Sequence, residues 1–112
     1  MDLTGDSLVK VLATLASPHR VRVLAALSGG PTYVSQLARD LGISRALLQV
    51  HLKRLEVSGL VASRIEVSDD GKAMKFYEVT PFDLRLTPQV LMTAARTLTD
   101  ATDRGESAKK EN

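Results

Sequence analysis

Residues 35–60, SQLARDLGISRALLQVHLKRLEVSGL, constrain the fold of this chain more than any other stretch. Apolar residues recur at helical spacing on both sides of Gly42, and Ser44 stands where a helix N-cap is expected. Glycine suits a reversal within three or four residues because it adopts a positive φ at little cost. Two short helices joined in this way have the spacing of a helix-turn-helix, whose second helix lies in the major groove of DNA.

Length and composition exclude several other classes of protein. The 112 residues, 44% of them hydrophobic, fit one domain with a modest core. No apolar run approaches the length of a membrane span, and the N-terminal MDLTGDSLVK lacks the features of a signal peptide. The absence of cysteine excludes disulfides, thiolate metal sites and cysteine nucleophiles. We therefore expect a cytoplasmic protein without a cofactor or membrane contact, and no catalytic motif indicates an enzyme.

Positive charge is concentrated in the middle of the chain. The net charge of the whole chain is +2, but residues 18–75 carry nine Lys and Arg against five Asp and Glu. The segments before and after this stretch are each net −1. This distribution favours a polyanionic partner for the central segment. Its nine cations are Arg20, Arg22, Arg39, Arg45, Lys53, Arg54, Arg64, Lys72 and Lys75.

Capping residues, prolines and apolar spacing predict the order of elements. Helices are expected from about residue 6 to 16, 18 to 27, 32 to 41, 44 to 57 and 87 to 99. β-Branched and aromatic residues predict strands at 60–67 and 73–79, with a turn at 69–71. The order α-α-α-α-β-β-α is that of a winged helix-turn-helix with one extra helix at each end. We expect residues 1–103 to form this single domain and the polar residues 104–112 to form a disordered tail.

Short polar residues and prolines set the expected helix starts. Asp6 and Ser7 are candidate caps of the first helix, and Ser17-Pro18 restarts the chain as a second helix. Thr87-Pro88 repeats this signal at the last helix. The side chains expected to face inward are Val21, Leu24 and Ala25 on the second helix, Val34, Leu37, Ala38 and Leu41 on the third, and Leu48, Leu52 and Leu55 on the fourth.

The outward face of the fourth helix predicts how DNA is read. Gln49 and Arg45 can donate hydrogen bonds to the edges of adenine and guanine, respectively. Val50 and Ala46 can contact the methyl group of thymine. Ser44 caps the N-terminus of this helix, where free N–H groups and the positive end of the dipole suit a phosphate.

Basic residues beyond this face are expected to contact the DNA backbone. Lys53 and Arg54, farther along the helix, fit phosphates and would set the register on the duplex. Arg64, Lys72 and Lys75 lie on the hairpin, which we interpret as a basic wing beside the backbone or in the minor groove. A solvated hairpin that uses lysine against strand-to-strand aggregation is the alternative.

The chain resembles the ArsR/SmtB family of bacterial and archaeal winged-helix regulators from about Leu12 to Val79. The resemblance rests on LASPHRVRVLAAL, VSQLARDLGIS, HLKRLEVSGLV and the hairpin GKAMKFYEV. It implies a homodimer that joins through the first and last helices, two recognition helices in successive major grooves, and a palindromic operator. The apolar residues expected at this interface are Leu8, Leu12, Leu15, Leu91, Ala94, Ala95 and Leu98.

Many members of that family sense metals, and this sequence departs from their ligand patterns. Tyr33 and Ser35 stand where thiolates would lie in the third helix, and residues 87–99 contain no histidine. The two histidines of the chain, His19 and His51, are interpreted as separate structural residues. We therefore expect no metal site, and a separate effector-binding protein as the source of the signal stays open.

Two alternatives to a plain DNA-binding regulator stay open. One is a metal- or ligand-responsive repressor with a non-standard effector site at the dimer interface. The other is a winged-helix module that binds a protein, although the outward cations argue against it. Double-stranded DNA is the expected partner, and the sequence does not indicate the operator or the sign of regulation.

Overall fold

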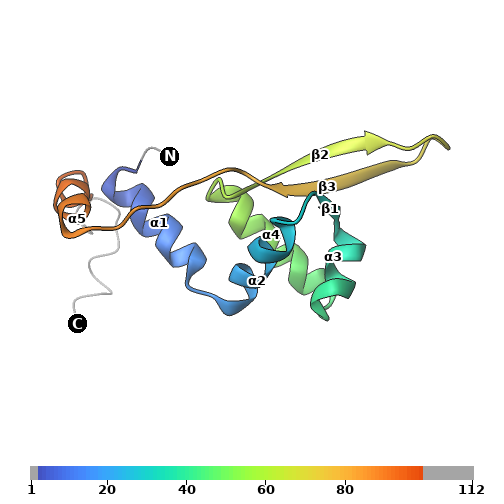
Figure 1. Cartoon of the computed structure of the whole chain (residues 1–112), viewed down its shortest axis with the longest axis horizontal. Helices are drawn as coiled ribbons and strands as arrows, with labels where there is room; N and C mark the ends of the chain where they lie inside the picture. Colours follow the sequence, from blue (N-terminus) through green and yellow to red (C-terminus); the bar gives the residue numbers. More distant parts are fainter. Residues whose placement is uncertain (1–2, 100–112) are drawn as a thin grey trace. The chain divides into compact units, whose positions relative to one another are not determined.

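The computed structural model describes residues 3–99, which form five helices and three strands (Figure 1). The chain divides into two units, Ala13–Phe82 and the described residues at the two chain ends. None of the described helices is long and apolar enough to span a bilayer. The expected tail, residues 104–112, lies outside the described residues. The elements are α1 Gly5–Leu15, α2 Pro18–Leu27, β1 Thr32–Tyr33, α3 Val34–Leu41, α4 Arg45–Val57, β2 Val61–Val67, β3 Ala73–Val79 and α5 Pro88–Ala95.

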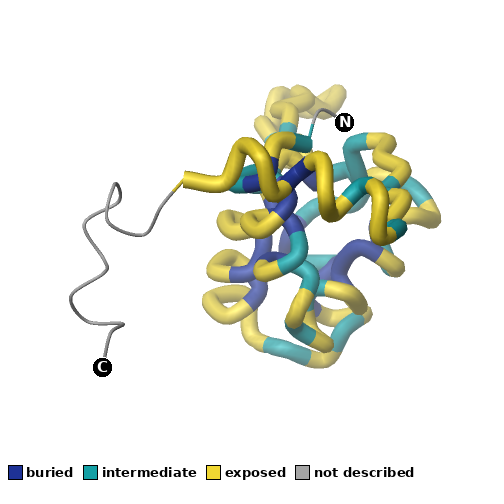
Figure 2. The backbone as a smooth tube through the Cα atoms, turned by 90° about the vertical axis from the view of Figure 1, so that its left-hand side faces the viewer, coloured by how far each residue is buried: buried dark blue, intermediate teal, exposed yellow. Residues whose placement is uncertain are grey.

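The unit Ala13–Phe82 is built around a leucine-rich core between three helices and the sheet. α4 contacts α2, α3 and β2, so it is the central helix of this unit. The burial of each segment can be followed in Figure 2. The expected stripe of Leu48, Leu52 and Leu55 is confirmed, because all three are fully buried. The other largest fully buried side chains are Leu37, Leu60 and Val23.

The sheet has three antiparallel strands in the order β1-β3-β2. β2 and β3 form the expected hairpin, which extends beyond the helices of its unit (Figure 1). β1 was not expected, because the helix was predicted to begin at residue 32. Instead, Thr32 and Tyr33 pair with Tyr77 and Phe76, and the helix begins at Val34. A β-branched and an aromatic residue after a proline favour extended backbone, and a partner strand was available.

The inward face of α2 also differs from the prediction. Val21 and Ala25 are exposed, whereas Val23, Leu24 and Leu27 are buried. In this orientation the half-buried Arg20 donates from Nε to the carbonyl oxygen of Thr14 at 2.6 Å. Apolar residues occupy most positions of this helix, so the sequence fits more than one inward face.

The ends of α1 and α5 correct two further expectations. Thr4 caps α1 in place of Asp6 or Ser7, since its Oγ1 accepts from the Ser7 amide at 3.3 Å. α5 ends at Ala95 instead of Thr99, and the amides of Thr97 and Leu98 form tighter i→i−3 bonds. The expected N-caps Ser17, Ser44 and Thr87 are confirmed, each accepting an amide hydrogen bond.

The unit at the chain ends joins the start of α1 to α5. The Gly5 amide donates to Thr97 Oγ1 at 2.6 Å, and the Asp6 carboxylate accepts from the Thr99 amide at 3.0 Å. Gly5 approaches α5 so closely that an added Cβ would lie 2.2 Å from the carbonyl oxygen of Ala94. Glycine is therefore needed here for a close approach rather than for a turn.

Candidate nucleic-acid interface

The turn between α3 and α4 has the geometry expected of a helix-turn-helix. Gly42 adopts the left-handed conformation, with φ 68° and ψ 32°, and ends α3. The Ile43 amide then donates to the carbonyl oxygen of Ala38 at 3.2 Å. Ser44 Oγ accepts from the Leu47 amide at 3.0 Å and starts α4. Three consecutive residues thus end one helix, reverse the chain and cap the next.

The face of α4 opposite its leucine stripe is open to solvent. It combines long polar donors with small apolar side chains, and even Val50 is 58% exposed. A solvent-facing apolar side chain between basic and amide side chains suits contact with base edges in a groove. The expected DNA contacts that are exposed on α4 are Arg45, Ala46, Gln49, Val50, Lys53 and Arg54.

The register of the hairpin separates its cations onto two faces of the sheet. Lys75 pairs with Ile65 and shares a face with the buried Tyr77, and its Nζ lies 5.4 Å from the centre of the Tyr77 ring. Arg64 pairs with Phe76 and therefore points to the opposite face. The sequence predicts backbone contacts for both residues and for Lys72, but the strands do not bring Arg64 and Lys75 together.

Arg64 is engaged by two carboxylates. Its Nε lies 2.7 Å from Glu66 and its Nη1 lies 2.8 Å from Glu78. The hydrogen bond to Glu66, followed by that to Glu78, raises the pKa of the Arg64 guanidinium above its ordinary value. Two nearby negative charges make this side of the wing a poor surface for a phosphate.

The tip of the hairpin is a tight turn held by its own polar groups. Gly71 has a φ of 84°, and the Asp70 carboxylate accepts from Ser68 Oγ and from the Lys72 amide. These bonds, with that from Ser68 the stronger influence, lower the pKa of the Asp70 carboxyl. The carboxylate thus stabilises the turn. Lys72, the residue after Gly71, has an exposed side chain.

A cavity of about 280 Å³ lies where α3, α4 and β3 meet. It brings together three residues that the sequence indicated as DNA contacts, Arg45, Gln49 and Lys75. It also includes Tyr33 and Ser35, which the sequence indicated only as residues in the place of metal ligands. Tyr33 belongs to the unexpected strand β1 and Ser35 to the first turn of α3, so the missing signal was the pairing of β1 with β3. The lining is completed by Val34, Ala73 and Met74.

The two histidines lie side by side, although the sequence suggested two separate structural residues. The rings of His19 on α2 and His51 on α4 are 5.3 Å apart between centroids. His51 is buried, and its Nδ1 lies 3.4 Å from Arg20 Nη1. A guanidinium can only donate, so Nδ1 accepts and the ring proton of neutral His51 lies on Nε2. Within residues 3–99, Nε2 has no hydrogen-bond partner.

This arrangement disfavours a charge on His51. Burial first, and then the positive charges of Arg20 and His19, lower the pKa of the His51 imidazole. The part of the chain that the structure describes contains no group of three or more His, Cys, Asp and Glu side chains arranged for a metal ion. In the described structure, the two imidazole rings pack against each other between α2 and α4.

The residues expected at a dimer interface differ in exposure. Leu8 and Ala94 are buried within the unit at the chain ends, and Leu12 and Leu15 are half-buried. Leu91, Ala95 and Leu98 are exposed.

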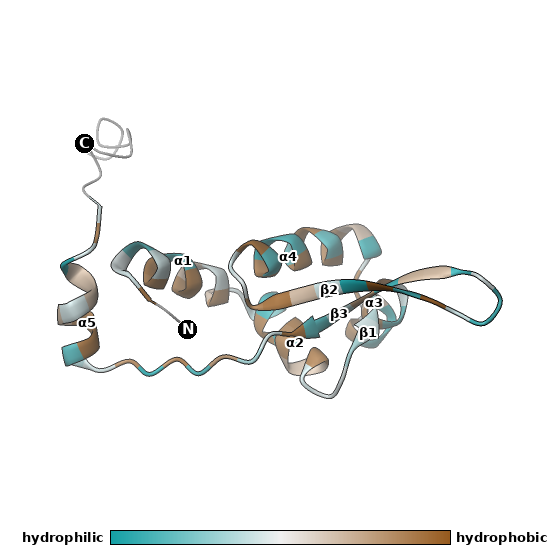
Figure 3. Ribbon diagram, turned by 90° about the horizontal axis from the view of Figure 1, so that it is seen from above, coloured by the Kyte–Doolittle hydropathy of each residue, from teal (hydrophilic) through white to brown (hydrophobic). Residues whose placement is uncertain are grey.

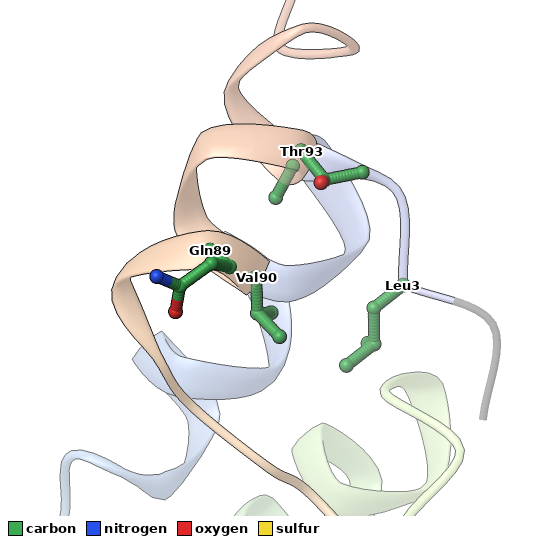
Figure 4. Close-up of a pocket in the computed structure, with 5 residues that line it drawn as sticks. Leu3, Gln89, Val90 and Thr93 are labelled. Atoms are coloured by element: carbon green, nitrogen blue, oxygen red, sulfur yellow. The ribbon is translucent and has the colours of Figure 1, made fainter.

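α5 also borders a cavity of about 270 Å³, which Figure 4 shows between Leu3 and the helix. Gln89, Val90, Thr93 and Ala94 complete its lining, and none of the lining residues is charged. This uncharged surface differs sharply from the basic surface at α4.

Comparisons with known proteins agree with this geometry. A family model described as "Bacterial regulatory protein, arsR family" matches residues 17–63. An HTH-type transcriptional regulator of Methanocaldococcus jannaschii is 30% identical over 83 residues, which cover 74% of this chain and 86% of the relative. The regulator CmtR of Mycobacterium tuberculosis is 37% identical over 65 residues, 58% of this chain and 55% of the relative.

A solved structure shares the fold over almost the whole chain. The NMR structure of a homodimeric winged helix-turn-helix DNA-binding domain from Mycobacterium bovis superposes with a TM-score of 0.60, at 20% identity. The match covers 96% of this chain and 85% of the other. The helix-turn-helix, the hairpin and these relatives agree on a DNA-binding transcriptional regulator rather than an enzyme. This chain belongs to the ArsR family of winged helix-turn-helix transcriptional regulators.

Proposed function

We propose that this protein is a homodimeric regulator that reads a palindromic operator in double-stranded DNA. One observation carries the proposal: α4 exposes a polar and basic face directly opposite three fully buried leucines. The core thus fixes which side chains are available to the groove. A recognition helix inserted by this face would meet base edges near its N-terminus and phosphates farther along.

The roles on α4 follow from the chemistry of the exposed side chains. Gln49 suits bidentate contact with adenine, and Ala46 and Val50 suit the methyl group of thymine. Lys53 and Arg54 would bind phosphates on one side of the groove. Arg45 and the capped N-terminus at Ser44 would contact DNA at the start of the helix.

On the wing, we assign backbone contact to Lys72 and Lys75. Both are exposed, and Lys75 lies on the face of the sheet that borders α4. The two ion pairs of Arg64 argue for leaving it out of the contact set. The wing would therefore contact the DNA backbone beside the recognition helix through Lys72 and Lys75, and not through the face that carries Arg64.

The terminal helices support the homodimer. Leu91 is 50% exposed and Met92 65% exposed on α5, and Leu98 is also open to solvent. Figure 3 shows the hydrophobic residues on α1 and α5. Apolar surface of this kind on a short helix is stabilised when a second copy covers it. The homodimeric M. bovis domain of the same fold supports this assignment.

A two-fold dimer would place two recognition helices in successive major grooves, which is why a palindromic operator is proposed. We further propose that residues 1–103 act as one functional domain in the cytoplasm. Because Tyr33 and Ser35 replace thiolates, we propose that no metal is sensed in the third helix and that the signal comes from elsewhere, such as a separate effector-binding protein.

Selection of bound fragments from the genome of the source organism tests this function. The wild-type protein should retain fragments that share a palindrome, with or without divalent metals, and affinity should fall steeply as salt rises. Gln49→Ala should relax the preference at one base position by about 1–3 kcal/mol. Lack of retention on any fragment at low salt would refute the proposed function.

A further inference from the structure

The cavity between α3, α4 and β3 has the chemistry of an anion site. Arg45 comes from the first residue of α4 and Lys75 from β3, so two cations from separate elements border one hollow. The hydroxyl-bearing Ser35 borders it from the first turn of α3, and Tyr33 of β1 borders it with its ring packed against Phe76. No Asp or Glu is among its lining residues. A hollow with two cations and no carboxylate favours a bound anion.

The hydrogen-bond donors around this cavity suit a phosphate in particular. A guanidinium offers a fork of donors that matches phosphate oxygens, and an ammonium adds a point charge. Arg45 also stands at the N-terminus of α4, the positive end of the helix dipole. Neither Arg45 nor Lys75 forms an ion pair within residues 3–99, in contrast to Arg64.

We propose that this cavity binds one phosphate of the DNA backbone, held by Arg45 and Lys75, with the hydroxyl of Ser35 as a further donor. The inference rests on the proposed function and deepens it. It moves Arg45 from reading guanine to binding a phosphate, and it leaves Gln49 beside the site as the reader of bases. The wing and the recognition helix would then contact the same phosphate. This shared contact would set the position of the wing relative to the recognition helix on the duplex.

A scan with neutral phosphates tests the site directly. On a duplex recovered by the fragment selection, single phosphates are replaced one at a time by methylphosphonate. For the wild-type protein, we expect one position in each half-site whose replacement weakens binding about threefold to tenfold. Arg45→Ala and Lys75→Ala should each weaken binding to unmodified DNA by a similar factor and should lose sensitivity at that same position.

Matched variants separate this site from a general loss of charge. Arg22→Ala removes an exposed cation of α2, outside the cavity, and should keep the sensitivity of the wild-type protein. Ser35→Ala should show a smaller loss at the same phosphate as Arg45→Ala. The slope of log affinity against log salt should become shallower by about 1 in Lys75→Ala. Circular dichroism establishes that each variant is folded.

Two results would overturn the proposal while leaving the proposed function intact. One is an Arg45→Ala variant that changes base preference at a single position and remains sensitive to the same methylphosphonate. The other is a Lys75→Ala variant whose methylphosphonate profile equals that of the wild-type protein. Failure of the wild-type protein to bind any fragment would instead remove the function on which the inference rests.

Discussion

The two units of the chain bury their apolar residues to different extents. In Ala13–Phe82, the six largest fully buried side chains form one core around α4. In the described residues of the unit at the chain ends, only a few apolar side chains are buried, among them Leu8 and Ala94. Leu91 and Met92 are exposed to solvent. The first unit has an extended core of its own, whereas the second leaves large apolar side chains open to solvent. Under the proposed function, the first unit would read DNA and the second would assemble the dimer.

Truncation of the central core should have the largest effect. Leu52→Ala removes a fully buried side chain of α4, and we expect a loss of about 2–5 kcal/mol in the free energy of unfolding. Urea denaturation at a fixed protein concentration measures it. Leu47→Ala, at a 39% exposed position of the same helix, is the control and should lose much less. Equal losses would show that the core is not centred on α4.

A charge on α5 should break the assembly without unfolding Ala13–Phe82. We expect Leu91→Glu to weaken dimerisation by about 30-fold or more, because a carboxylate would be buried without a partner. Sedimentation across a range of concentrations measures the change. Gln89→Glu, which adds the same charge elsewhere on α5, is the matched control. An unchanged dimer in Leu91→Glu would contradict the assignment of this face.

A methyl group at Gly5 tests the close contact within the unit at the chain ends. In Gly5→Ala, the new Cβ would meet the carbonyl oxygen of Ala94 and the Cγ of Leu98, which lie 2.2 and 2.8 Å from its ideal position. We expect a loss of about 1–3 kcal/mol from overpacking. Gly29→Ala provides the control, since its nearest neighbour lies at 3.6 Å. If the two variants lose equal stability in urea, the close approach is not present in solution.

The smallest effect should be a loss of stability in mild acid. The pKa of His51 is lowered in the folded state, while the unfolded chain has the ordinary value of 6.5. Below that value the unfolded state binds more protons, so the free energy of unfolding should fall as pH decreases through 6.5. Urea midpoints measured from about pH 7.5 to about 5.5 follow this change.

Substitution isolates the contribution of His51 to the pH dependence. His51→Gln should flatten the curve over that range, because the titrating ring is gone. His19→Gln removes one of the charges that face His51 and keeps Arg20, so it should only reduce the dependence. A curve that is equally steep in His51→Gln would assign the acid sensitivity to other groups.

The sequence predicted most of the elements because their signals are local. Ser17, Ser44 and Thr87 are short-range caps, and the spacing of Leu48, Leu52 and Leu55 determines the buried face of α4. Strand β1 was missed because two residues become a strand only through a distant partner. On α2 the prediction was confirmed at Leu24 and wrong at Val21 and Ala25, because apolar residues at most positions of this helix fit more than one inward face.

The exposed residues of α4 were predicted from the sequence, but the arrangement of the cavity beside them was not. The exposed residues of α4 are those that the spacing of the apolar stripe predicts, because the period of a helix determines which side chains face away from its buried side. The separation of Arg64 from Lys75 depends on which strand faces are buried, and the site of Tyr33 and Ser35 depends on β1. Pairing between strands far apart in sequence decides both, and the sequence shows no direct signal of it.

The pairing of β3 on both sides has a consequence for how such wings can vary. Side chains alternate along a strand, so one residue inserted between Lys75 and Phe76 would turn Lys75 to the face that carries Arg64. An insertion of two residues would keep Lys75 on its present face and carry it outward by about 7 Å. An insertion at this point of β3 therefore keeps Lys75 on the face opposite Arg64 only when it adds an even number of residues.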